Sequence, residues 1–173
     1  MKDRTCKDIT IREANNSDST HILDLIFKIW VDEYHFDVKK EHFPDLHEIE
    51  KYYSKEDGIF LVSIIGNQIV GTIACNRLTH HSFVLKRMFV DKNYRRLGIA
   101  QMLLNNLFSL MIGSIEFDKV SFYLSTKEID AISAKKFYIK NGFRVIQKSM
   151  LPDNFPFFYK DDLFMMKDSD FLP

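Results

Sequence analysis

The segment from residue 83 to residue 111 constrains the fold most, because it joins a strand-like run to a helix-like run through one short basic turn. Residues 83–91 are mainly apolar and suit a strand. After the turn, small and apolar residues recur at helical spacing and form one stripe, made of Ala100, Leu103, Leu104, Leu107 and Met111. A strand that leads through a turn into an amphipathic helix is typical of mixed α/β folds.

The turn itself, Arg95-Arg96-Leu97-Gly98-Ile99-Ala100, has the chemistry of an anion site. Backbone N–H groups at a helix start have no intrahelical partner, and the helix dipole adds partial positive charge there. Gly98 removes a side chain where an anion must approach closely, and Ala100 stays small for the same reason. The alternative is an ordinary strand-to-helix turn with solvated arginines. Lys86, Arg87 and Lys92 make this the most basic stretch of the chain.

The other elements complete one central sheet with helices, which we expect to form a single domain over residues 1–173. Gly66-Asn67 suits a two-residue hairpin turn, and Asp45, after Pro44, is expected to cap a short helix. Asn141-Gly142 ends the last helix. The expected order is a strand near 9–12, a helix from cap residues 15–18 to about 34, a short helix at 45–53, strands at 59–65, 68–75 and 83–91, the amphipathic helix, a strand at 120–124, a helix, and strands at 143–150 and 163–167.

Charge and cysteine content exclude several classes of partner. The chain has 24 Lys and Arg and 24 Asp and Glu, so nothing global attracts it to nucleic acid or to an anionic membrane. Cys6 and Cys75 form neither a CxxC pair nor a zinc spacing. His35, His42 and His47 lack tight ligand spacing, so we expect no metal. A charged N-terminus and short apolar runs predict a cytoplasmic protein without a membrane partner.

Three motifs in order resemble the GNAT superfamily of N-acetyltransferases. Arg95, Gly98 and Ala100 match the family fingerprint of Gln or Arg, two residues, Gly, one residue, then Gly or Ala. The strand Leu85–Val90 resembles the family's fourth strand, and Ala134–Phe143 resembles a later helix and the strand after it. The resemblance implies an acyl-CoA N-acyltransferase fold, with a mostly antiparallel central sheet, splayed fourth and fifth strands, and flanking helices.

The resemblance also implies roles for individual residues. Backbone groups of Met88 and Val90 would pair with the pantetheine arm of acetyl-CoA, and a backbone N–H near Phe89 or Val90 would polarise the acetyl carbonyl. Tyr138 would be the general acid, the alternative being that it packs beside Phe137 in the core. The cofactor-binding set, including the backbone amides that would hold the pyrophosphate, is Met88, Phe89, Val90, Arg95, Arg96, Leu97, Gly98, Ile99, Ala100 and Gln101.

Two residues depart from the family pattern. Val84 stands where many relatives carry a Glu that can act as a base, and Ala131 stands where many carry Asn. The sequence therefore does not identify the general base, and bound water and Glu33 are the candidates.

The resemblance implies an acceptor pocket formed by the loop between the first two helices and the loop between the last two strands, here roughly Trp30 to Asp45 and Leu151 to Asp162. The alternative for the aromatic side chains of these loops is packing in the core or in a lid. Asp32, Glu33 and Asp37 would attract a cationic amine. The aromatic residues of the two loops are Trp30, Tyr34, Phe36, Phe43, Phe155, Phe157, Phe158 and Tyr159.

The prediction is an acetyl-CoA-dependent N-acetyltransferase, with no metal, that acts on a primary amine of a small molecule or peptide. A homodimer is one open oligomeric state. The alternatives are a non-catalytic or regulatory acyl-CoA-binding module of the same fold and, without the resemblance, a phosphate-binding α/β protein. The last lacks both GxxxxGK[ST] and GxGxxG motifs.

Overall fold

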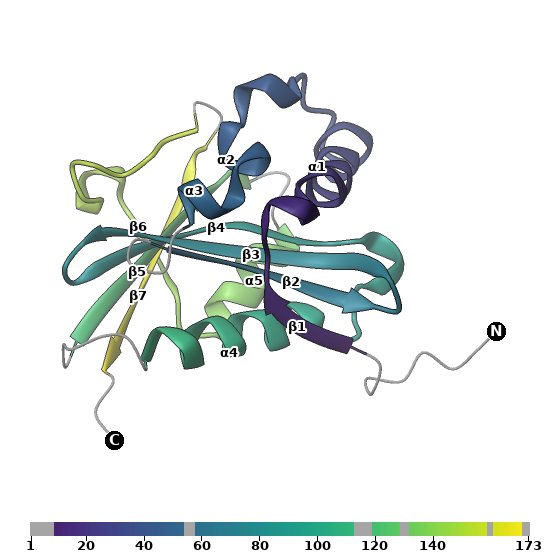
Figure 1. Cartoon of the computed structure of the whole chain (residues 1–173). Helices are drawn as coiled ribbons and strands as arrows, with labels where there is room; N and C mark the ends of the chain where they lie inside the picture. Colours follow the sequence, from purple (N-terminus) through teal and green to yellow (C-terminus); the bar gives the residue numbers. More distant parts are fainter. Residues whose placement is uncertain (1–8, 54–57, 113–118, 129–131, 159–160, 171–173) are drawn as a thin grey trace. The chain divides into compact units, whose positions relative to one another are not determined.

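The computed structural model describes residues 9–53, 58–112, 119–128, 132–158 and 161–170 (Figure 1). Within these ranges, no helix is long and apolar enough to cross a bilayer. The elements are β1 (Ile9–Glu13), α1 (Ser19–Lys28), a π-helical turn (Ile29–Glu33), α2 (Pro44–His47), α3 (Ile49–Tyr52), β2 (Gly58–Ile65), β3 (Gln68–Thr79), β4 (Ser82–Val90), α4 (Ile99–Ile112), β5 (Lys119–Thr126), α5 (Ile132–Lys140), β6 (Arg144–Ile146) and β7 (Leu163–Asp170).

The described strands hydrogen-bond in the order β1-β2-β3-β4-β5-β7-β6 and form a seven-stranded sheet. The pairs β1–β2, β5–β7 and β6–β7 are antiparallel, whereas β4 and β5 are parallel. The paired stretch of β4 and β5 is short and joins Ser82–Val84 to Ser121–Tyr123. This mixed α/β sheet confirms the expected fold class.

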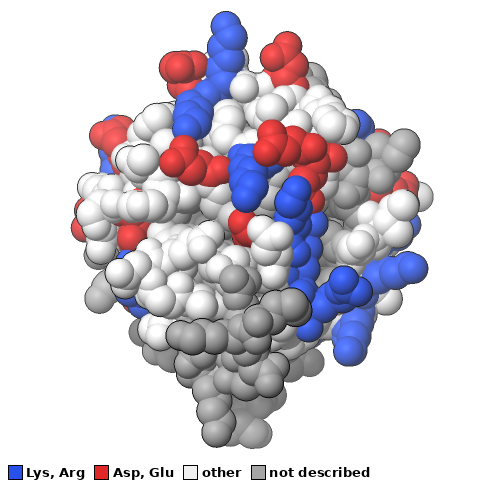
Figure 2. Space-filling model, turned by 90° about the vertical axis from the view of Figure 1, so that its right-hand side faces the viewer, with Lys and Arg blue, Asp and Glu red and all other residues white. Residues whose placement is uncertain are grey.

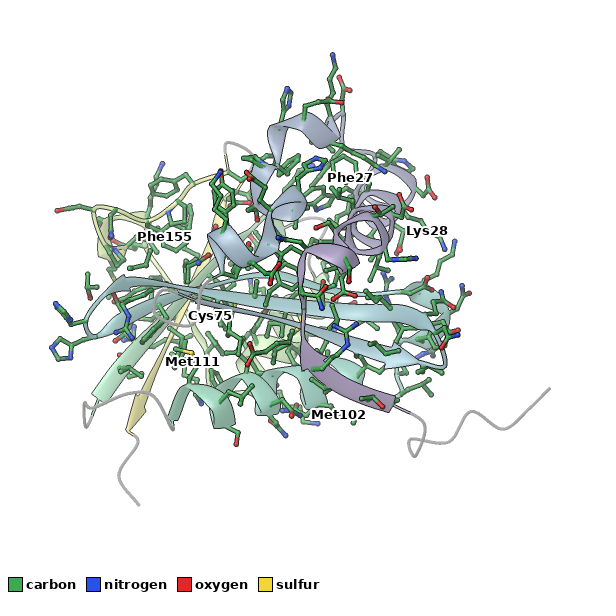
Figure 3. The ribbon with its side chains drawn as sticks, viewed as in Figure 1. Phe27, Lys28, Cys75, Met102, Met111 and Phe155 are labelled. Atoms are coloured by element: carbon green, nitrogen blue, oxygen red, sulfur yellow. The ribbon has the colours of Figure 1, made fainter. Side chains whose placement is uncertain are left out.

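The chain divides into two compact units, the first made of Met1–Cys75 and Arg87–Ser114 and the second of Asn76–Lys86 and Ile115–Pro173. In the first unit, α1, α2 and α3 lie on one face of the strands β1 to β3, and α4 lies on the opposite face (Figure 1). The predicted apolar stripe of α4 explains this position, because Leu103, Leu104 and Leu107 are completely buried. Met111 of α4 and Cys75 of β3 are buried as well (Figure 3).

Helix α4 approaches the sheet closely at Gly71 of β3. A Cβ atom added at Gly71 would lie 3.1 Å from Cγ2 of Ile99, the first residue of α4, and 3.2 Å from Cδ1 of Leu103. The same atom would lie 2.7 Å from the Oγ of Ser63 on β2. Ser63 is fully buried, and its Oγ has no hydrogen-bond partner among the described residues. The missing side chain at Gly71 therefore lets the first turn of α4 rest directly on the sheet.

The second unit has its own aromatic core. Phe83 of β4 and Phe122 of β5 stack with their ring centroids 5.6 Å apart, and both side chains are at most 1% exposed. A further cluster, at the β6–β7 pair, is formed by Ile146, Phe164 and Met166. Burial of aromatic rings and aliphatic side chains is the main favourable term in folding such a unit.

The predicted cap residues form a capping box on the 3-10 turn Asn16–Asp18 that leads into α1, and the last part of the predicted helix, Ile29–Glu33, is π-helical instead of α-helical. The side chain of Asn15 accepts a hydrogen bond from the N–H of Ser17, and Asp18 accepts one from the N–H of Asn15, so both ends of a capping box are present. After α1, the N–H of Tyr34 donates to the carbonyl of Ile29 at 3.1 Å, five residues back. π-Helical turns of this kind are frequent at functional sites.

Three expectations about local structure are wrong. Asp45 does not cap a helix; Pro44 begins α2, and the Asp45 carboxylate is buried beside Tyr53 and Arg87 instead. The expected helix over residues 45–53 is split into α2 and α3 at Glu48, whose φ of −124° is not helical. The expected strand at 143–150 is limited to β6, because residues 148–150 form a one-turn 3-10 helix.

We expect Gly71→Ala to destabilise the protein by about 1–3 kcal/mol, the usual cost of overpacking a core. The added methyl group forces Ser63, Ile99 or Leu103 to move. Ser63→Ala alone should be neutral or stabilising, because the Ser63 hydroxyl is buried without a partner in the described part of the chain. The double variant should regain part of the loss. Urea unfolding of the four proteins measures this, and equal stability of wild type and Gly71→Ala would contradict the close packing.

Candidate functional site

The turn before α4 has left-handed backbone at two positions, which are separated by one residue. Arg96 has a φ of 65° and Gly98 a φ of 79°. Helix α4 then begins at Ile99, and its first intrahelical bond is donated by the N–H of Met102 to the carbonyl of Gly98 at 3.0 Å. A Cβ atom at Gly98 would meet no heavy atom within 4 Å, so this side of the turn is open. The N–H groups at the start of a helix next to open space can bind an anion.

The loop that leads to this turn is held at its start and in its middle. At its start, Asp91 donates its N–H to the carbonyl of Val70 at 2.9 Å, and its Oδ1 accepts from the N–H of Asn93 at 2.8 Å. In the middle, the buried Tyr94 donates its hydroxyl to Oε1 of Gln68 at 3.1 Å. The bonds to Val70 and Gln68 tie the loop to the beginning of β3. The sheet therefore fixes the shape of the loop before any ligand binds.

Arg95, the first residue of the fingerprint, lies in a tight hydrogen-bonded contact with Glu33. Its Nη1 and Nη2 donate to the two carboxylate oxygens of Glu33 at 2.6 and 2.9 Å, and its Nε donates to the carbonyl of Val90 at 2.9 Å. Lys28, one of the labelled residues of α1 in Figure 3, lies 3.4 Å from Oδ2 of Asp91. The segment that contains α1 and the π-helical turn is therefore linked to the loop twice.

Strand β4 contains a backbone irregularity at Arg87, whose φ is 56°. Left-handed backbone inside a strand is the geometry of a bulge, which interrupts the ladder and redirects the residues that follow. The hydroxyl of Thr72, which is fully buried on β3, donates to the carbonyl of Arg87 at 2.6 Å and holds this conformation. The next three residues, Met88, Phe89 and Val90, are half-buried. These are the residues predicted to meet the pantetheine arm.

The Arg87 side chain lies in a polar and aromatic cluster. Its Nε and Nη2 donate to the two oxygens of Asp45 at 3.0 and 2.9 Å, and Tyr53 donates its hydroxyl to Oδ2 of Asp45 at 2.6 Å. The guanidinium carbon lies 5.4 Å from the ring centroid of Trp30 and 5.2 Å from that of Phe43. The centroids of the two rings lie 4.7 Å from each other, and the rings cover part of the guanidinium, which helps to shield the ion pair from water.

Electrostatics keeps this cluster in one protonation state. Burial opposes the charge of Arg87, but Asp45 and Tyr53 together outweigh it and raise the Arg87 pKa. Burial, followed by the negative charge of Asp45, raises the pKa of Tyr53 well above its ordinary value. Tyr53 therefore stays protonated near neutral pH and remains a donor.

The expected general acid, Tyr138, lies in the second unit on α5. Its side chain is 6% exposed, and its ring makes edge contacts with Phe137 and Phe143 at centroid distances of 5.3 and 5.2 Å. Helix α5 ends as predicted, with Gly142 at a φ of 84°. These contacts place the ring in the core of the second unit, and the catalytic role of its hydroxyl stays a prediction. Ala131 lies outside the described residues.

Comparison with known proteins decides the family. The family model of the acetyltransferase (GNAT) domain matches residues 56–145. An acetyltransferase of the GNAT family from Staphylococcus aureus Mu50 is 35% identical, with a TM-score of 0.84 over 92% of this chain and 98% of that one. The chain belongs to the GNAT family of acetyltransferases.

Two further relatives bear on cofactor and acceptor. The PaiA N-acetyltransferase of Thermoplasma acidophilum, solved in complex with coenzyme A, is 20% identical and shares the fold, with a TM-score of 0.65 over 93% of this chain and 99% of that one. An N-acetylaspartate synthetase of Xenopus tropicalis is 32% identical over 117 residues, which are 62% of this chain and 40% of the relative. The chain thus spans less than half the length of the curated relatives it matches.

Of the aromatic residues expected in the acceptor loops of this GNAT protein, only Trp30, Phe43 and Phe155 are buried core residues, whereas Tyr34, Phe36 and Phe158 are half-buried. Trp30 and Phe43 are at most 8% exposed and pack against Phe27, with centroids 5.3 and 5.7 Å from the Phe27 ring (Figure 3). In the second unit, Phe155 is buried, whereas Phe157 is 48% exposed. Tyr159 lies outside the described residues. Among the described residues, no group of three His, Cys, Asp or Glu side chains gathers as a metal site would require.

Sequence reasoning missed the partners of Arg87. It treated Arg87 as one of several basic residues near the turn and Asp45 as a cap. An arginine within a mostly apolar strand that follows two buried β-strands is a weak signal for a buried ion pair. The partner Asp45 is 42 residues away, so no local pattern identifies it.

We expect Asp45→Ala to destabilise the protein by about 3–5 kcal/mol, because removal of one member of a buried ion pair leaves the other charged and unpaired. The side chains of Arg87 and Asp45 are only 15% and 10% exposed. The matched control is Asp24→Ala, which breaks an exposed pair with Lys40 and should cost about 0–1 kcal/mol. Guanidinium unfolding compares the two. A similar small cost in both variants would show that the Arg87 cluster is not a structural anchor.

Proposed function

We propose that this GNAT protein is an acetyl-CoA-dependent N-acetyltransferase whose acceptor is the primary amine of a small molecule, in particular the amine of an amino acid. The observation that carries the proposal is the start of α4, where Gly98 leaves an open approach to the N–H groups of a 14-residue helix. An anion site of this kind on a GNAT domain fits the pyrophosphate of coenzyme A. We propose that the whole chain forms one acetyltransferase domain.

Residues of β4 and of the α4 turn would hold the cofactor. The backbone N–H groups of Arg96, Leu97, Gly98, Ile99, Ala100 and Gln101 would bind the pyrophosphate. Beyond the bulge at Arg87, the backbone of Met88 and Val90 would pair with the amide groups of the pantetheine arm in the manner of an added strand. A backbone N–H of Phe89 or Val90 would donate to the carbonyl oxygen of the thioester and stabilise the negative charge that develops there.

Acetyl transfer to an amine that starts as an ammonium ion requires three proton movements: one proton leaves the nitrogen before attack, a second leaves it as the amide forms, and the departing thiolate gains one. The amine nitrogen forms a bond to the acetyl carbon while the carbon–sulfur bond breaks, so the amine loses a proton and the departing thiolate gains one. An amine of ordinary pKa, near 10, is almost fully protonated at neutral pH, so a base must act first. Val84 replaces the glutamate of many relatives, and both Glu33 oxygens accept hydrogen bonds from Arg95. Bound water is therefore the base that we propose, with Tyr138 as the acid.

Two observations support an amino-acid acceptor. Two curated relatives, of Xenopus tropicalis and Danio rerio, are named N-acetylaspartate synthetase and are 32% and 34% identical to this chain over the matched residues. The exposed carboxylates of Asp32 and Asp37, in the segment predicted to line the acceptor pocket, would attract the ammonium form of such an amine.

Binding of acetyl-CoA tests the cofactor site. Acetyl-CoA at about 100 times its dissociation constant should stabilise the wild type by roughly 2.7 kcal/mol, visible as a rise in Tm. Gly98→Glu should lose this shift, because a carboxylate then occupies the phosphate approach. Gly66→Glu is the matched control, since Gly66 has a φ of 60° and equally open surroundings in the hairpin turn. Both variants carry similar backbone strain, so equal acetyl-CoA binding by the two would exclude Gly98 from the site.

Turnover tests the chemistry. Release of the free coenzyme A thiol, measured over a panel of amino acids, polyamines and peptides, should identify an amino-acid amine as the best acceptor. With that acceptor, Tyr138→Phe should lower turnover by about 10² or more and leave acetyl-CoA affinity nearly unchanged. The loss should shrink with a thioester whose leaving thiol has a lower pKa.

The control for this experiment is Tyr123→Phe, which removes a hydroxyl from β5 of the same unit. Its turnover should stay near wild type. Full activity in a folded Tyr138→Phe variant would remove Tyr138 from the mechanism. Binding of acetyl-CoA without turnover on any amine would favour the regulatory module instead.

A further inference from the structure

We infer that Glu33 is a positioning residue for the cofactor, acting through Arg95; the inference rests on the proposed binding of coenzyme A. Glu33 is the last residue of the π-helical turn and touches neither β4 nor α4 through its own described hydrogen bonds. Its two carboxylate oxygens instead fix the guanidinium of Arg95. That guanidinium in turn holds the part of the backbone that we assign to the cofactor.

The Arg95 guanidinium links the loop between β4 and α4 back to the end of β4. Its Nε donates to the carbonyl of Val90, the last residue of β4, while its Cα belongs to the loop five residues later. This bond sets the spacing between the strand proposed for pantetheine and the turn proposed for pyrophosphate. A single flexible arginine would lose much side-chain freedom to make that one bond. The fork-to-fork contact with Glu33, at 2.6 and 2.9 Å, supplies the geometry that keeps the guanidinium in place.

The direction of Glu33 depends on the π-helical turn. The bond from the N–H of Tyr34 to the carbonyl of Ile29 inserts one extra residue into the last turn of the helix that begins as α1. One extra residue rotates the side chains that follow by about 100° relative to a continuous α-helix. The turn thus determines which side of the helix end Glu33 faces. Its side chain is 20% exposed, compared with 40% for Arg95, so the carboxylate is the better-shielded partner of the pair.

Simple electrostatics and positioning predict opposite effects for this residue. Glu33 is a negative charge near a site proposed for a polyanion, so on Coulomb grounds its removal should tighten coenzyme A binding. Removal of Glu33 would also free the Arg95 guanidinium to contact the phosphates. If Glu33 instead holds Arg95 in place on Val90, its removal should weaken binding, because the loop must then be ordered by the ligand. The sign of the change separates the two explanations.

The experiment measures the affinity of the full chain for coenzyme A by calorimetry, without acceptor, so that no chemistry takes place. Glu33→Gln keeps the shape of the side chain and removes its charge, and we expect it to weaken coenzyme A binding by about tenfold. Arg95→Lys keeps the charge but lacks the fork that reaches Val90 and Glu33 together, so it should weaken binding similarly. The double variant should lose little more than either single one, because both changes break the same contact.

The control is Asp24→Asn, which removes a negative charge from α1 at an exposed pair with Lys40 and should leave the affinity unchanged. The unfolding free energy of each variant and its kcat at saturating acetyl-CoA are measured alongside. Unchanged binding by Glu33→Gln would overturn the inference, and tighter binding would overturn it and make Arg95 a direct phosphate ligand. Unchanged binding with reduced kcat would make Glu33 the base. Failure of the wild type to bind coenzyme A would overturn the proposed function itself, and the positioning role with it.

Discussion

Arg87 adopts a φ of 56° in the middle of β4, a conformation that costs an L-residue about 1–2 kcal/mol. Contacts with two residues hold Arg87 in this conformation. Thr72 donates to its carbonyl, and the buried carboxylate of Asp45 binds its side chain. The residues that follow, Met88 to Val90, owe their direction to this one irregular position. Everything proposed for the pantetheine arm therefore depends on a strained residue that the first unit fixes through β3 and α2.

The composition of the Arg87 cluster indicates that it fixes local geometry. A buried ion pair is a poor source of net stability, since well-packed apolar residues of the same volume often do as well or better. A cluster of this kind is better explained by the geometry that it imposes. Asp45 accepts two hydrogen bonds from Arg87 and one from Tyr53, and the rings of Trp30 and Phe43 shield the guanidinium. The hydrogen bonds of this cluster permit only one orientation of the Arg87 side chain. An apolar residue at this position would not be held in one orientation in the same way.

The sequence was a good guide wherever the signal was local. The stripe of Leu103, Leu104 and Leu107 lies buried as its helical spacing predicts, and the turns at Gly66 and Gly142 have the positive φ that glycine permits. The fold class followed from the order of the elements and from three family motifs.

The features that carry the site were hidden for two physical reasons. Positive φ at Arg87 and Arg96 is a tertiary effect, because arginine has no intrinsic preference for that region. Contacts such as Arg95 with Glu33 join residues 62 positions apart, and no periodicity reports them. Asp45 shows how a local rule fails, because its position after Pro44 resembles a cap until a buried cation competes for the carboxylate. Tyr138 was found by its motif, yet a motif does not distinguish a buried ring from an acid.

The phosphate site that we propose would rely on backbone groups more than on free cations. The chain is neutral overall, and the face in Figure 2 carries basic and acidic side chains next to one another. Arg95 is matched by Glu33, and Lys28 lies beside Asp91, so two cations near the turn are already paired. The N–H groups at the start of α4 are fixed by the helix, and Gly71 sets how closely that helix rests on the sheet. A site made of fixed dipoles needs its loops placed accurately, because dipole interactions fall off faster with distance than charge interactions do. Ion pairs that position the loop therefore serve such a site better than cations that point at the ligand.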